Sequence, residues 1–114
     1  MQLKTAGLTP IDENGVTSEP AVTFRATLAD LDGDQTKLQV ELKEATQPFD
    51  SLNILESSFS SSQIATSTLK SGAYHWRARA LDSKGITSVW QEFGTAGNTD
   101  FTIGRTIKVG VILA

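Results

Sequence analysis

The stretch from Leu69 to Asp82 constrains the fold of this chain more than any other part of the sequence. After a turn signal at Ser71-Gly72, aromatic or small residues alternate with residues that are mostly polar or charged. One set is Tyr74, Trp76, Ala78 and Ala80, and the other is His75, Arg77, Arg79 and Leu81. Because successive side chains of a strand point to opposite faces, this period of two predicts a half-buried strand. The aromatic face of such a strand needs a second layer to cover it.

Shorter segments with the same period lie on either side of this stretch and are separated by turn signals. Val22, Phe24, Ala26 and Leu28 alternate with polar residues, and so do Leu38, Val40 and Leu42. No segment has apolar residues at helical spacing over ten or more positions. The expected strands are 3–10, 21–30, 37–44, a short edge strand within 45–62, 63–69, 69–82, and a last strand over 86–103 that a loop around Gly94 to Asn98 interrupts. About seven short strands predict an all-β sandwich, with residues 11–20 as a connection along its edge.

The motif Leu69-x-x-Gly72-x-Tyr74, followed by small and apolar residues at every second position, resembles the fibronectin type III and related immunoglobulin-like domains. The resemblance covers about residues 8–103. It implies an antiparallel immunoglobulin-like β-sandwich in which Tyr74 forms a tyrosine corner, with its ring in the core and its hydroxyl bonded to nearby backbone. The residues to which the resemblance gives structural roles are Leu69, Gly72, Tyr74, Trp76 and Trp90, the last closing one edge of the core.

The C-terminal residues have no place in a sandwich of seven strands. Val111-Ile112-Leu113 is a continuous apolar run, which is typical of strands that are covered on both faces. We therefore expect residues 1–104 to form the sandwich and residues 105–114 to be a linker or the first strand of a truncated following domain. The alternative is that this tail pairs with another chain.

Composition excludes several classes of function. A chain of 114 residues suffices for one domain, and its net charge of −3, with Lys and Arg spread along the chain, offers no basic surface for nucleic acid. The chain contains no Cys, so it has no disulfide and no thiolate nucleophile. No apolar run approaches the roughly 18 residues of a membrane helix, so no membrane span is expected.

The sequence favours no catalytic site and no cofactor. The only His, His75, has no nucleophile and orienting carboxylate in a defined arrangement around it. Asp30, Asp32 and Asp34 lie at alternate positions of a tight turn, a pattern that a calcium ion accepts. A hairpin turn in which Asp side chains bond their own backbone and Gly33 supplies a positive φ explains the same pattern more simply. We therefore do not favour a metal site there.

The outer face of the sandwich is the remaining candidate surface. Glu41 and Lys43 are expected to oppose Arg77 and Arg79 across neighbouring strands, as ion pairs on a solvated face. No outward aromatic stripe of the kind that stacks on sugar rings is evident from the sequence.

These observations together favour a non-catalytic structural, spacer or interaction module. The resemblance implies a larger secreted or cell-surface protein of microbial origin, with neighbouring domains and a protein or glycan ligand as possible partners. The alternative is a ligand-binding module, with calcium at the Asp30 to Asp34 turn or a glycan on the outer sheet.

Overall fold

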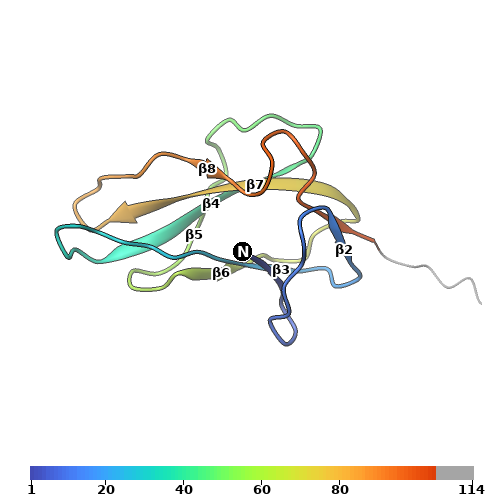
Figure 1. Ribbon diagram of the computed structural model, residues 1–114, viewed down its shortest axis with the longest axis horizontal. Coiled ribbons are helices and arrows are strands. Elements are labelled where there is room, and N and C mark those ends of the chain that lie inside the picture. Colours follow the sequence, from blue (N-terminus) through green and yellow to red (C-terminus); the bar gives the residue numbers. More distant parts are fainter. Residues whose placement is uncertain (105–114) are drawn as a thin grey trace, which may run out of the picture.

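Two facing sheets make up the structure, a computed structural model that describes residues 1–104 (Figure 1). Those residues contain strands and loops and no helix, so the predicted all-β class is confirmed. The smaller sheet is antiparallel and has the order β1-β3-β6. Its strands are β1 (Gln2–Lys4), β3 (Val22–Arg25) and β6 (Gln63–Ala65).

The larger sheet is built around the strand that the alternation predicted. It has the order β2-β9-β7-β4-β5, and β8 also pairs with β7. Its strands are β2 (Gly15–Thr17), β4 (Thr36–Glu44), β5 (Leu55–Glu56), β7 (Gly72–Asp82), β8 (Gln91–Glu92) and β9 (Phe101–Ile103).

The antiparallel pair β4–β7 is the longest strand pairing in this sheet. Its register runs without interruption from Thr36 opposite Asp82 to Glu44 opposite Tyr74. The other edge of β7 is shared: β9 pairs with its first residues and β8 with Arg77 and Ala78. The predicted interruption of the last strand is therefore the loop between β8 and β9.

The strand predictions need correction on two points. The predicted connection 11–20 contains β2, which pairs with β9 in parallel, so the sandwich is not antiparallel throughout. Asn14, with φ of 63°, and the buried side chain of Ile11 turn the chain into this strand, and three residues are too few to show a period of two. The second correction concerns length, because three predicted strands end earlier in the structure: β1 at Lys4 rather than Pro10, β3 at Arg25 rather than Asp30, and β6 at Ala65 rather than Leu69.

The core lies between the two sheets and contains the inward residues of both. Phe24 of β3 occupies its centre, with ring centroids 4.5 Å from Trp76 and 6.2 Å from Phe101. The buried cluster consists of Ile11, Val22, Phe24, Leu38, Val40, Tyr74, Trp76, Phe101 and Ile103. Burial of a large apolar side chain of this kind contributes about 1.5 to 3 kcal/mol, so the cluster is the main source of stability.

Two sequence expectations concern the extent of the domain and its relation to membranes. The tail, for which a linker or the first strand of a following domain is expected, lies outside the described residues. Across residues 1–104, no helix is long and apolar enough to cross a membrane.

Candidate functional site

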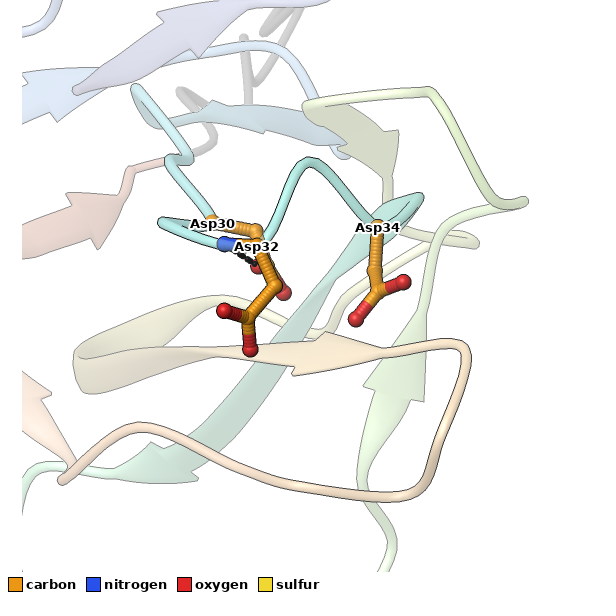
Figure 2. Close-up of side chains that lie close together, drawn as sticks. All are labelled: Asp30, Asp32 and Asp34. Carbon is orange, nitrogen blue, oxygen red and sulfur yellow. Dashed lines mark hydrogen bonds between the residues drawn. The ribbon is translucent and has the colours of Figure 1, made fainter.

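The acidic turn between β3 and β4 gathers the three carboxylates that the sequence singled out (Figure 2). One oxygen from each of Asp30, Asp32 and Asp34 lies within 4.8 Å of the others. The turn is made by local hydrogen bonds: the Asp32 N–H donates to Asp30 Oδ1 at 2.7 Å, and the Gly33 N–H donates to the Asp30 carbonyl at 3.2 Å. Gly33 has φ of 74°, a conformation that Gly adopts without steric cost. The local hydrogen bonds and the positive φ at Gly33 are those predicted from the sequence. The predicted hairpin is wrong, however, because this turn connects strands of two different sheets that do not pair with each other.

The same turn is a poor ligand set for calcium. Calcium takes six to eight oxygen ligands, and the cluster brings together the carboxylates of three residues. Asp30 already uses Oδ1 within the turn. The ammonium of Lys84 lies 3.5 Å from Asp34 Oδ2 and supplies part of the positive charge that a cation would bring.

Calcium is expected to leave the melting temperature of the chain unchanged. A site with micromolar affinity would add about 4 kcal/mol of stability at a thousandfold excess of ion. Melting the chain with calcium and with a chelator measures this difference, and Asp32→Ala serves as the matched variant. A calcium-dependent rise that disappears in Asp32→Ala would establish a metal site here.

The outer face of the larger sheet is not the solvated surface that the sequence predicted. Glu41 and Arg77 are directly opposite in the β4–β7 register, as expected, but Glu41 is 0% exposed. Its Oε1 accepts from the Arg77 guanidinium at 2.8 and 2.6 Å. Its Oε2 accepts from the backbone N–H groups of Asp50 and Ser51, at 2.7 and 3.1 Å. The loop that follows β4 therefore folds back over the sheet and is bonded to it through Glu41.

His75 lies under the same loop. Its ring stacks on Phe49, with centroids 4.1 Å apart, and its Nε2 lies 2.7 Å from the carbonyl oxygen of Gln47. The alternation predicts His75 on the outward face, either solvated or in contact with a neighbouring strand or layer, and the structure excludes the solvated alternative because His75 is buried. Both contacts fix the ring in place as part of the loop's packing.

Aromatic rings and cations alternate across this outer face. The Arg77 guanidinium lies 4.8 Å from the Phe49 ring and 4.5 Å from the Trp90 ring, and Arg79 lies 4.2 Å from Trp90. Such contacts contribute about 0.5 to 2 kcal/mol each, depending on burial. Trp90 therefore lies on the outer face, and it does not close an edge of the core as the resemblance implied. Because the aromatic residues come from loops, strand periodicity gave no signal for this stack.

The remaining residues to which the resemblance gave structural roles surround the start of β7. Tyr74 is buried, which raises the pKa of its hydroxyl, and this hydroxyl donates to the carbonyl oxygen of Lys70 at 2.7 Å. Gly72 has φ of 147°, and Leu69 packs against the core. Trp76 lies in the core and stacks on Phe93 with centroids 5.0 Å apart.

A buried polar network that the sequence did not reveal crosses one edge of the core. The Trp76 indole N–H donates to Gln2 Oε1 at 3.0 Å, and the Gln2 amide donates to the Asp100 carbonyl at 2.7 Å. Asp100 lies between β8 and β9, where its Oδ2 accepts from the Trp76 backbone N–H at 2.9 Å. This carboxylate takes the place of a strand partner for β7.

Asp100 carries an energetic cost for this role. It is 1% exposed, and within residues 1–104 its Oδ1 has no hydrogen-bond partner. Burial raises the pKa of the Asp100 carboxyl to about 6, and the negative charges of Glu13 and Glu92 add to the rise. The charged form is thus disfavoured in the folded protein.

Comparisons of the chain with protein-family models, with curated proteins and with solved structures found no match.

Proposed function

We propose that the chain is a non-catalytic, immunoglobulin-like module of a larger secreted or cell-surface protein. The observation that carries the proposal is that Glu41, His75 and Arg77 on the outer face all contact the loop after β4. Each of these side chains has the chemistry of a catalytic or binding group, and each is bonded to, or stacked on, the loop that covers it. Their role in this arrangement is to fix the loop to the sheet, which suits a structural domain.

Two features support an immunoglobulin-like topology of the fibronectin type III kind. The hydroxyl of Tyr74 bonds to backbone four residues upstream, at the corner between β6 and β7, which is the position of a tyrosine corner. The strand order also suits this topology, because the first, third and sixth strands form one sheet and the others form the second.

The variant Tyr74→Phe is expected to lose on the order of 1 kcal/mol of unfolding free energy. The ring stays in the core, and the bond to the Lys70 carbonyl is the contact that is removed. Urea denaturation of both proteins measures the difference. Equal stability within error would argue against a tyrosine corner, and Thr102→Val on the neighbouring strand is a control for removal of a hydroxyl elsewhere on the same sheet.

A glycan-binding function for the outer face receives less support. Sugar rings stack on aromatic faces that are free to receive them, and here the Trp90 ring is in contact with two guanidinium groups. The ring of Phe59 is 40% exposed and lies beside the Lys37 ammonium. The aromatic residues of this face therefore support its cations and its loop.

An antibody raised against residues 1–104 tests the proposal in the source cells. We expect it to detect a polypeptide longer than 114 residues in the culture medium or in the fraction that protease removes from intact cells. Detection only inside the cells, or only as a chain of 114 residues, would contradict the proposal. Self-association of the isolated chain, which light scattering measures, is a separate property and does not depend on where the protein is located.

A further inference from the structure

An open groove separates the two sheets at the end where β3 stops early. It has a volume of about 420 Å³ and lies between the segment 26–29, which follows β3, and the stretch 88–94 around β8. The residues of its apolar lining are Ala26, Leu28, Ala78, Ala80, Val89 and Phe93. Two of these, Ala78 and Ala80, lie on β7, so this part of its inner face has small side chains that leave space above them, although Leu38 and Trp76 also line the groove.

One wall of this groove has an unpaired backbone edge. Pairing of β1 with β3 ends where the Met1 carbonyl accepts from the Arg25 N–H at 2.9 Å. Backbone groups alternate between the two sides of a strand, and the Ala26 N–H bonds to Ser62 on the β6 side. The N–H and C=O of Thr27 therefore point to the β1 side, and no group in residues 1–104 bonds to either. Such an edge is a template for another strand.

The C-terminal tail of the chain has the sequence pattern of a strand that fits this groove. Ile107, Val109, Val111 and Leu113 fall on one side of an extended chain, and Thr106, Lys108, Gly110 and Ile112 fall on the other. Branched apolar residues at every second position suit a space that is lined by Ala. The tail carries Arg105 and Lys108 and no acidic residue, and the groove lining contains one acidic residue, Glu92, and one basic residue, Arg79.

The last described strand, β9, is directed away from this groove. β9 pairs with β7 at Gly72 to Tyr74 and is antiparallel to it, so the chain leaves β9 in the direction away from Ala78 and Ala80. Figure 1 shows the end of β9 and the groove segments toward opposite ends of the long axis. A second molecule meets no such constraint.

We propose that residues 106–113 of one molecule bind in this groove of a second molecule, as a strand added beside residues 27–29. The backbone of Thr27 provides the hydrogen bonds, and the apolar side of the tail fills the space above Ala78 and Ala80. Because the end of β9 and the groove lie toward opposite ends of the described residues, the contact is head-to-tail and repeats along a row of molecules.

Light scattering of the full chain over a range of concentrations tests the proposal with two matched pairs of variants. Val109→Glu places a charge on the apolar side of the tail, and Thr106→Glu adds the same charge on the other side. Thr27→Pro removes the N–H of the groove edge, and Thr27→Ala retains it. We expect the mean mass of the natural chain, Thr106→Glu and Thr27→Ala to rise with concentration, and Val109→Glu and Thr27→Pro to stay monomeric.

Hydrogen exchange of the natural chain provides a second readout, which does not depend on the folding of Thr27→Pro. The Thr27 amide is expected to exchange at least tenfold more slowly at high concentration than at low concentration. A natural chain that is monomeric at every concentration would overturn the proposal and leave the tail as part of a following domain. Association that is lost in Val109→Glu, with no change of exchange at Thr27, would show that the tails pair elsewhere and would also overturn it.

Discussion

Replacement of Glu41 by Ala is expected to lower the free energy of unfolding by about 3 to 5 kcal/mol, the usual cost of removing one partner of a buried ion pair. Glu41 is fully buried, and both of its carboxylate oxygens are bonded. Its loss leaves the Arg77 guanidinium without its counter-charge, and it leaves the N–H groups of Asp50 and Ser51 without an acceptor. Urea denaturation of the two proteins measures the difference.

The variant Glu56→Ala provides the matched control on the same sheet. Glu56 forms an ion pair with Lys37 at 3.1 Å, but its side chain is 41% exposed. Exposed pairs contribute between 0 and about 1 kcal/mol, so this variant is expected to stay close to the natural chain. If Glu41→Ala cost no more than Glu56→Ala, the buried pair would not be holding the loop to the sheet.

The second large effect concerns pH and the carboxyl group of Asp100. Its pKa is about 6 in the folded chain, and the ordinary value, which applies to the unfolded chain, is 3.8. Between these values the folded chain binds more protons, so the contribution of Asp100 is fully present below pH 3.8 and is lost as the pH rises through 6. At 1.36 kcal/mol for each unit, the loss is at most about 3 kcal/mol.

The variant Asp100→Asn isolates this contribution. The amide oxygen of Asn still accepts from the Trp76 N–H and carries no charge, so the variant should be more stable than the natural chain at pH 8, with the advantage shrinking toward pH 4. Asp50→Asn is the control of opposite sign, because a backbone hydrogen bond from Leu52 and the ammonium of Lys43 lower the pKa of Asp50. Its stabilising contribution is present at neutral pH and is lost in acid. An Asp100→Asn difference that is the same at pH 4 and pH 8 would contradict the raised pKa.

The parts of the fold that the sequence predicted are those with a long and regular pattern. Strand 37–44 was predicted within one residue of β4, and the alternation from Tyr74 to Leu81 lies within β7, because a period of two over eight or nine residues is hard to produce by other means. The turn at Asp30 was also predictable, since its hydrogen bonds join residues that are close in sequence. β2 has three residues, and its partner β9 is far away in the chain, so no local sequence pattern predicted β2.

The outer face shows the limit of the same reasoning for the candidate site. Alternation correctly placed Glu41, His75 and Arg77 on the side away from the core. Whether that side meets water depends on the path of the loop after β4. This path is fixed by side-chain contacts that strand periodicity does not report, namely the bonds from Glu41 to the N–H groups of Asp50 and Ser51 and the stacking of Phe49 on His75. The one available signal was an aromatic residue, Phe49, inside a polar loop, and the sequence did not indicate that it packs on His75.

Hydrogen exchange at the amides of Asp50 and Ser51 tests most directly whether the outer face serves to hold the loop. Both residues lie in an irregular segment outside the strands, where amides exchange rapidly unless they are bonded. Because both donate to Glu41 Oε2, we predict that they exchange at rates comparable to those of the β4 and β7 amides, and that Glu41→Gln accelerates them while Glu56→Ala does not. Rapid exchange of both amides in the natural chain would contradict the claim that Glu41 fixes the loop to the sheet.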